Sequence, residues 1–580
     1  MSRLPFPPRT PQHKMMAGLS IGILALLAVI LSLDAPWKGL AAKTIKRGKP
    51  FGVEEYMQVG LWWSGVGVAI FLAILLVSLP LWWKWTERAT DAPAPEKRKK
   101  AGWEWAILAG AVLVAGILRF SLADQSVLHD EHDNLRRNYH GFTAIGEGNK
   151  GDVWHPAGYR EALFENARGN NPFLYSLLSH ASIDAWRVFS GAPRDRFNVT
   201  AMRIPSLLAG MGGILTAWLL ARRIGGAKVA ALAVWLMAIH PLHVKYSVEA
   251  RGYSIVLLFA PVFLLCCLNV VERGRWKDAF GVSFTAATML YAYPGAAYFV
   301  GASAVGLVAA FLWKGNADLR GTLVRVVISG SLALGLLIFL IAPGLLQATS
   351  NLDNQFAKTG LPPVWHFQMW HWMGLGLHLP ADQEYYDLRD GVVTWSVFLP
   401  QTLRAEPFAA LLGWLVLPIL ILIGARQWWR MGRAYRPLVV ASLGGPLLFL
   451  CHHGLITHFA VFQWYMIYAL PSLMIFASSG LFSLLEKKMD SEISPKQVWI
   501  PASVAVAIVG MFWLASHHPS KHHPVVLYTP WETDAGLPTA RNMMHRGPNY
   551  WETWMDGRVL RLDKMKDGKK PAASDGDDDP

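Results

Sequence analysis

Long apolar runs alternate with shorter polar segments along almost the whole chain. A helix of roughly 20 apolar residues spans the hydrocarbon core of a bilayer, and the sequence holds about thirteen runs of that kind. The first three lie near residues 15–33, 61–83 and 103–120. The pattern predicts an all-α polytopic integral membrane protein, whose first run is kept as a span because no clear cleavage site follows it.

Lysine and arginine gather in every second connecting segment, which predicts a cytoplasmic location for those segments. They are Arg222 and Arg223; Arg273, Arg275 and Lys277; Lys314 and Arg320; Arg426, Arg430 and Arg433; Lys487 and Lys488. Three larger polar segments then share the outer face: residues 121–198, 347–404 and 516–580. The loop between the first two runs departs from this rule, because it would place five cations outside: Lys38, Lys43, Lys46, Arg47 and Lys49.

Composition supports the membrane class and excludes others. Hydrophobic residues make up 53% of the 580 residues and charged residues only 16%, whereas a soluble domain carries about 25% charged residues. The net charge of +14 would favour nucleic-acid binding in a soluble protein. Here the cations border apolar runs, so membrane orientation explains them and no nucleic-acid partner is expected. The cysteines lie in or beside apolar runs without metal-ligand spacing, so no disulfide framework is predicted.

The densest polar cluster follows the third apolar run and reads His129, Asp130, Glu131, His132, Asp133. Crowded carboxylates favour a raised pKa on one member, a bound cation, or a nearby arginine or lysine. Each outcome is typical of an active centre, and a hydrated loop start is the plain alternative. The His and Asp residues could also bind a metal ion, although no His-Glu-x-x-His or Cys-x-x-Cys pattern supports this.

A second polar cluster, residues 240–253, lies at the outer end of the fifth predicted span. A guanidinium fork binds two phosphate oxygens together, so Arg251 is a candidate anion clamp. Lys245 adds a point charge, and His243 and Glu249 are nearby in the sequence. The alternative is an arginine that extends to water or pairs with Glu249.

The polar segments contain two predicted interfacial helices. Apolar residues recur at helical spacing over residues 172–189, and aromatic residues gather over residues 365–372; plain anchoring by an aromatic belt is the alternative for both. We expect three regions: an added N-terminal hairpin and linker (1–102), a transmembrane core (103–515) and a solvated extracytoplasmic tail (516–580).

Several short motifs occur in a fixed order between residues 103 and 258. They are Leu118-Arg119, Asp130-Glu131, Asn171-Pro172-Phe173-Leu174-Tyr175, Arg203-Ile204-Pro205-Ser206, Arg222-Arg223-Ile224-Gly225-Gly226, His240-Pro241, and Tyr246-Ser247-Val248-Glu249-Ala250-Arg251-Gly252-Tyr253. This order resembles the multi-pass glycosyltransferases of the GT-C fold, of the protein O-mannosyltransferase and aminoarabinose transferase type (glycosyltransferase family 39). The family often has a doubled proline where this chain has Asn171-Pro172.

The resemblance implies transfer of a hexose or pentose from a polyprenyl-phosphate donor to a protein, lipid or glycan acceptor, usually with inversion. Asp130 matches the family's proposed catalytic base, Glu131 is its motif partner, and Arg251 matches the motif beside the lipid phosphate. Direct displacement needs one carboxylate to take the acceptor proton and a cation to compensate the leaving phosphate, which agrees with these residues.

We therefore expect a glycosyltransferase in a bacterial inner membrane, with its site facing the periplasm or exterior. In this hypothesis Glu131 orients the acceptor or helps to hold a divalent cation, Lys245 or His243 assists Arg251, and Asn171 and Tyr175 line the donor side. No cofactor is certain. The alternatives are a lipid-linked sugar transporter or flippase, which should carry charges through its spans, and a ligase or polymerase of surface polysaccharide.

Overall fold

The structure is a computed structural model. It describes residues 11–86, 102–124, 127, 129–145, 151–312, 317–349, 363–376, 394–405, 407–457, 462–486, 507, 510, 543–544, 552–555 and 558–562. The last predicted span, before residue 515, lies almost entirely outside these residues.

Helices form most of the described chain, and they follow the apolar runs. In the N-terminal half they are α1 (Pro11–Ser32), α2 (Gly39–Lys46), α3 (Val53–Thr86), α4 (Gly102–Phe120), α5 (His129–Asn134), α6 (Tyr159–Phe164), α7 (Phe173–Ser190), α8 (Val199–Ile239), α9 (Pro241–Val248) and α10 (Tyr253–Arg273). Then follow α11 (Trp276–Ala292), α12 (Ala297–Leu312), α13 (Ala317–Thr349), α14 (Pro363–Leu375), α16 (Trp395–Ala405), α17 (Pro407–Leu411), α18 (Leu417–Met431), α19 (Arg436–Val439), α20 (Gly445–His452) and α21 (Leu470–Glu486).

Short π-helical or 3₁₀ turns connect or extend several of these helices. They are η1 (Leu135–Tyr139), η2 (Pro294–Ala296), η4 (Leu412–Val416), η5 (Val440–Gly444), η6 (His453–Thr457) and η7 (Gln463–Ala469). The two predicted interfacial segments are confirmed as helices, since α7 covers all but the first residue of one and α14 covers the whole of the other.

The polytopic membrane architecture is confirmed. Within the described residues, nine helical segments are long and apolar enough to cross a membrane. One of them, α8, is interrupted at Gly226, which has a φ of 79°, a conformation that glycine adopts at little steric cost. Arg119, at the end of α4, donates a hydrogen bond to the Ala238 carbonyl near the end of α8. Arg203, near the start of α8, donates to the Ala123 carbonyl, just after α4. Both ends of α8 thus lie near the same end of α4. The chain therefore reverses at Gly226, where the sequence predicts a short turn.

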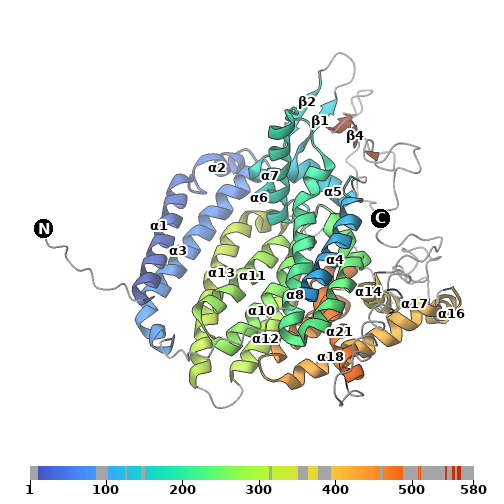
Figure 1. The fold of residues 1–580 in the computed structure, drawn as a ribbon. Coiled ribbons are helices and arrows are strands. Elements are labelled where there is room, and N and C mark those ends of the chain that lie inside the picture. Colours follow the sequence, from blue (N-terminus) through green and yellow to red (C-terminus); the bar gives the residue numbers. More distant parts are fainter. Residues whose placement is uncertain are drawn as a thin grey trace.

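The helices form one bundle whose two ends differ (Figure 1). α1 and α3 lie along one edge, with α3 against α13, and α18 and α21 pack together at the other edge. We call the end that carries α5, α6 and α7 the loop face; it is uppermost in Figure 1. The connection through α2 is on the same face, because Arg160 of α6 pairs with Glu54 of α3 at 3.2 Å.

A small β-sheet, which the sequence does not predict, accompanies the helical framework. Its strands are β1 (Gly141–Ile145), β2 (Val153–Pro156), β3 (Met543–Met544), β4 (Glu552–Met555) and β5 (Arg558–Leu562), in the order β2-β1-β5-β4-β3. Strand β1 pairs in parallel with β5, with Thr143 opposite Leu560, and the other pairs are antiparallel. None of these five strands exceeds five residues, so they offer no long alternating pattern that would reveal them.

Candidate active site at the loop face

The site is built around the short segment between α9 and α10, residues 249–252. Glu131 of α5 is fully buried, and its Oε1 accepts a hydrogen bond from the backbone N–H of Ala250 at 2.5 Å. The guanidinium of Arg203, also fully buried, donates to both carboxylate oxygens of Glu131, through Nε at 3.1 Å and Nη2 at 2.6 Å. This two-pronged ion pair fixes α5 against α8 and against Ala250.

The carbonyl group of Ala250 is also hydrogen-bonded to a side chain. The hydroxyl of Tyr139, in the turn η1, donates to the Ala250 oxygen at 2.8 Å. One residue earlier, the Glu249 carbonyl oxygen accepts from the Ser206 hydroxyl of α8 at 2.5 Å. We call Glu131 and Tyr139 the Ala250 clamp, because together they bind both polar groups of that residue. The clamp and Ser206 fix the backbone on which Arg251 stands.

Replacing Tyr139 by phenylalanine should destabilise the protein by about 1–3 kcal/mol, because the buried Ala250 carbonyl loses its donor. Thermal or denaturant unfolding of the purified chain measures this loss. Tyr159→Phe is the control, since that side chain is 48% exposed and its substitution should change stability by less than about 0.5 kcal/mol. Equal stability of the two variants would contradict a clamping role for Tyr139.

The clamp also brings the backbone of Asp130 near that of Arg251. Asp130 lies in the first turn of α5 beside Glu131, and Arg251 follows Ala250; the Asp130 side chain is outside the described part. The hydrogen-bond length, added to the greatest extension of the covalent chain from Asp130 Cα to Glu131 Oε1 and from Ala250 N to Arg251 Cα, limits the Cα–Cα separation of Asp130 and Arg251 to about 17 Å. The backbones of these two residues therefore lie at the same end of the bundle.

Arg251 itself is 9% exposed. Its guanidinium lies 5.5 Å from the centre of the Tyr253 ring, and Nη2 is 3.4 Å from the Tyr253 hydroxyl. Lys245 Nζ lies 3.6 Å from Glu249 Oε1 and 5.7 Å from the Tyr246 ring. Glu249 is therefore paired with Lys245.

His243 has a different setting from the one expected for a phosphate ligand. Its Nδ1 accepts a hydrogen bond from Arg119 Nη2 at 2.7 Å, and both residues are fully buried. Arg119 also donates to the carbonyl oxygens of Ala115 and Ala238, each at 3.0 Å. The Arg119–His243 contact thus joins α4, α8 and α9.

Asn171 and Tyr175 are also engaged inside the protein. The Asn171 amide donates to the carbonyl oxygens of Ala162 and Glu165, at 3.2 and 2.6 Å, and Asn171 Oδ1 accepts from the Ser176 hydroxyl. Tyr175 is fully buried, and its hydroxyl donates to the Met202 carbonyl at 2.8 Å. These contacts tie α7 to α6 and α8.

Gly252 explains why the Asn171-Pro172 motif and the Arg251 motif occur together. A Cβ at position 252 would collide with the carbonyl oxygen of Ala292 and would lie 3.2 Å from Pro172 Cβ. Only glycine fits between these two neighbours. The chain therefore passes from Arg251 into α10 through a point packed against α11 and against the start of α7.

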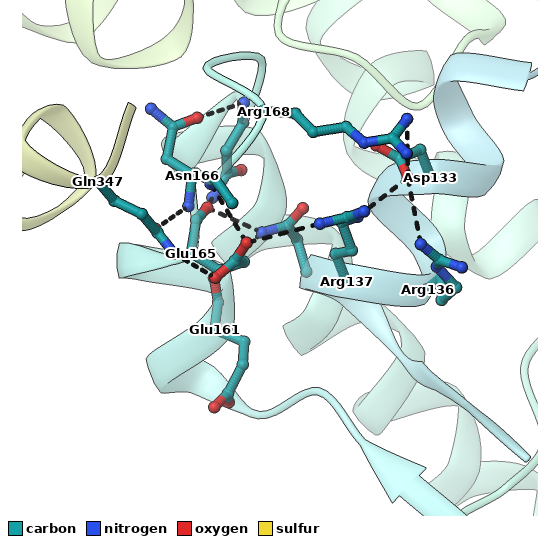
Figure 2. A network of polar contacts seen from close by, with 11 residues as sticks. Asp133, Arg136, Arg137, Glu161, Glu165, Asn166, Arg168 and Gln347 are labelled. Atoms are coloured by element: carbon teal, nitrogen blue, oxygen red, sulfur yellow. Dashed lines mark hydrogen bonds and ion pairs between the residues drawn. The ribbon is translucent and has the colours of Figure 1, made fainter. Parts of the chain in front are cut away.

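Arginines, one of the three expected outcomes, surround Asp133, a further carboxylate of α5 (Figure 2). Asp133 Oδ1 accepts from Arg137 Nε at 3.0 Å, and Arg136 and Arg168 each lie 3.8 Å from it. Burial tends to raise the pKa of the Asp133 carboxyl, but Arg137, Arg168 and Arg136 outweigh it and lower that pKa below 3.8. Asp133 is therefore ionised at neutral pH.

The network extends from Asp133 to another outer segment. Arg137 Nη1 lies 3.9 Å from Glu165 Oε1, and Gln347 of α13 donates to Glu165 Oε2 at 2.8 Å (Figure 2). The side-chain oxygen of Gln347, Oε1, accepts a hydrogen bond from the backbone N–H of Asn166 at 2.6 Å. α5 is thus connected to the loop-face end of α13. No group of three or more His, Cys, Asp or Glu side chains suited to a metal ion occurs among the described residues.

The lowered pKa of Asp133 predicts a pH dependence of stability. A depressed folded pKa contributes stability above the unfolded value of 3.8, and that contribution is lost as the pH falls through the lower folded pKa. The apparent melting temperature of the protein should exceed that of Asp133→Asn near pH 6, and the difference should shrink below pH 3.8. A difference that is constant from pH 6 to pH 3 would contradict the arginine network as its source.

A comparison with protein families finds a match to one segment of the chain. Residues 195–343 match the family described as dolichyl-phosphate-mannose-protein mannosyltransferase. The matched segment contains Arg203, Ser206, Ala250 and Arg251 of the site. The match confirms the predicted resemblance to the GT-C membrane glycosyltransferases of this type. No curated protein matches the chain.

Several solved structures are similar to this chain. The Archaeoglobus fulgidus oligosaccharyltransferase, in a complex with zinc and sulfate, is 14% identical, with a TM-score of 0.43 over 75% of this chain and 56% of its own. ArnT from Cupriavidus metallidurans is 13% identical, with a TM-score of 0.39 over 73% and 66%. The arabinosyltransferase EmbB from Mycobacterium smegmatis is 11% identical, with a TM-score of 0.32 over 85% and 48%. The chain thus spans about half to two thirds of these proteins' lengths.

Proposed function

We propose that the chain is a membrane glycosyltransferase that moves a sugar from a polyprenyl-phosphate donor to an acceptor at the loop face, by inverting single displacement. The observation that carries the proposal is the hydrogen bond between Glu131 and Ala250. It brings the helix of Asp130 next to the segment of Arg251, within a site partly built by the family-matched residues 195–343. A proton acceptor and a phosphate-binding cation are the two groups that this reaction needs.

In the proposed mechanism Asp130 takes the proton from the acceptor hydroxyl or amine. The acceptor atom forms a bond to the anomeric carbon while the bond from that carbon to the phosphate oxygen breaks. The electron pair leaves with the polyprenyl phosphate, whose added charge Arg251 compensates. One carboxylate is sufficient, because the attacking group is the acceptor itself and no covalent enzyme intermediate forms.

Glu131 acts in this mechanism as a positioning residue. Both of its oxygens already accept hydrogen bonds, from Arg203 and from Ala250, so its described contacts favour that role over orienting the acceptor or holding a cation. His243, Asn171 and Tyr175 likewise support the fold around the site. Lys245 is a second cation of the residue 240–253 cluster, and it pairs with Glu249.

The proposal is tested with the full chain in liposomes that contain a polyprenyl-phosphate hexose or pentose, supplied with lipid, peptide and glycan acceptors. Mass spectrometry should detect free polyprenyl phosphate together with a product that carries a new glycosidic bond. Movement of the intact donor between leaflets without a new bond would instead identify a transporter. The lipid that co-purifies with the protein, analysed in the same way, should be an isoprenoid carrier and would name the sugar.

A further inference from the structure

The loop between α1 and α3 carries a concentration of positive charge that the proposed reaction does not use. It lies outside the family-matched residues 195–343. All five of its cations are exposed, and within the described part no ion pair joins them to another residue: Lys38, Lys43, Lys46, Arg47 and Lys49. We call this set, together with α2, the basic loop.

The basic loop is held rigidly against α3. Gln58 of α3 accepts a hydrogen bond from the Ala41 N–H at 3.2 Å and donates to the Asp34 carbonyl at 2.8 Å. The Thr44 hydroxyl donates to Glu55 Oε1 at 2.8 Å. Ala41 and Thr44, three residues apart on one side of α2, are buried. The opposite side of the helix therefore faces outward in a fixed orientation.

The outward surface mixes cations with large apolar side chains. Trp37 is 60% exposed, Leu40 38% and Ile45 63%. α1 and α3, which the loop joins, are both long and apolar enough to cross a membrane, so the loop lies at a membrane–water boundary. Exposed indole and aliphatic groups beside lysines are typical of a helix that lies in the headgroup layer.

The loop carries more positive than negative charge. Between residues 34 and 55 there are five cations and three carboxylates, Asp34, Glu54 and Glu55. Glu54 pairs with Arg160, and Glu55 accepts from Thr44 and from the Gly52 N–H. Other cations, such as Arg222, Arg223 and Arg275, lie at the opposite end of the bundle, where membrane orientation explains them. Orientation does not explain the basic loop, since it is on the loop face (Figure 1).

We propose that the basic loop binds the headgroups of anionic phospholipids in the leaflet at the loop face. Lysine and arginine near a bilayer surface are attracted to anionic lipid, and Trp37, Leu40 and Ile45 provide an apolar surface for the acyl boundary. A soluble anion would use the cations but not these three side chains. The added N-terminal hairpin thus places a lipid-binding surface on the same face as the active site.

The test uses the full chain in nanodiscs with equal amounts of phosphatidylglycerol and phosphatidylcholine, followed by native mass spectrometry of the lipids that remain bound in detergent. Lys43→Gln/Lys46→Gln/Arg47→Gln should lower retained phosphatidylglycerol at least threefold without changing retained phosphatidylcholine. Lys43→Arg/Lys46→Arg/Arg47→Lys, which keeps the charge, should bind as the parent does. Arg426→Gln/Arg430→Gln/Arg433→Gln is the matched control, because it removes three cations from the opposite end.

An equal loss of retained phosphatidylglycerol in the two glutamine variants would overturn the proposal, because binding would then not depend on where the three cations lie. Displacement of phosphatidylglycerol by excess inorganic phosphate, but not by sodium chloride of equal ionic strength, would also overturn it in favour of a soluble phosphate ligand. Unchanged thermal unfolding of all variants shows that the bundle remains folded. A selective loss in the basic-loop variant supports the proposal whether or not the transferase assay succeeds.

Discussion

Asp130→Asn should lower the rate of sugar transfer by roughly 10²- to 10⁴-fold, the usual contribution of a general base. Asparagine has nearly the same shape but cannot accept the acceptor proton at neutral pH. The measurement is the rate of product formation by purified protein at saturating polyprenyl-phosphate sugar. Donor binding should change little, because in this hypothesis the phosphate is bound by Arg251, so the loss should appear in kcat.

Asp124→Asn is the control for that experiment. Asp124 precedes α5 in the same loop and is exposed, so the substitution removes a nearby negative charge without touching the proposed reacting groups. Its rate should stay within about twofold of the parent, since surface substitutions are usually mild. Near-normal turnover by a folded Asp130→Asn protein would remove Asp130 from the role of base.

The sequence predicts most of the helical framework because each apolar run carries its own signal. The turn at Gly226 is an example: Arg222, Arg223 and two glycines mark it locally, and the positive φ of Gly226 is the predicted break. The β-sheet has no such signal. Its central pair joins Thr143 to Leu560, and neither five-residue strand reveals its partner.

The candidate site was only partly predictable for the same reason. Composition points to Glu131 and Asp133 as members of a crowded acidic cluster, but it cannot name the arginines that satisfy them. Arg203 is 72 positions away from Glu131, and its signal is that a charged residue stands at the start of an apolar run, where burial requires a partner. Nothing in the sequence marks Tyr139 as the donor to Ala250, since a single tyrosine in a polar loop is common.

The family motifs acquire a physical meaning once these contacts are considered together. In the Arg203-Ile204-Pro205-Ser206 motif, Arg203 neutralises Glu131 while Ser206 holds the Glu249 carbonyl. Glu131 and Tyr139 then bind Ala250 from the other side. Glu131, Tyr139 and Ser206 therefore fix the two peptide groups on either side of Ala250, and Arg251 follows directly. The motifs near Arg251 serve largely to hold its backbone, which a pattern of residue types does not distinguish from direct substrate binding.

Arg203→Met should destabilise the protein by about 3–5 kcal/mol, because it leaves the buried Glu131 carboxylate without its counter-charge. Methionine fills a similar volume, so lost packing contributes little. The free energy of unfolding, measured by denaturant titration in detergent, should fall by that amount. The activity of the remaining folded protein should also fall, since Glu131 loses the ion pair that orients it toward Ala250.

The double variant Glu131→Gln/Arg203→Met separates the buried charge from other causes. Glutamine removes the charge, and its Oε1 still accepts from the Ala250 N–H as Glu131 does. Because a buried ion pair often contributes little net stability while half of one is costly, the double variant should be more stable than Arg203→Met alone. If the two substitutions instead add, so that the double variant is the least stable of the series, the buried pair is not what fixes α5 to the active-site segment.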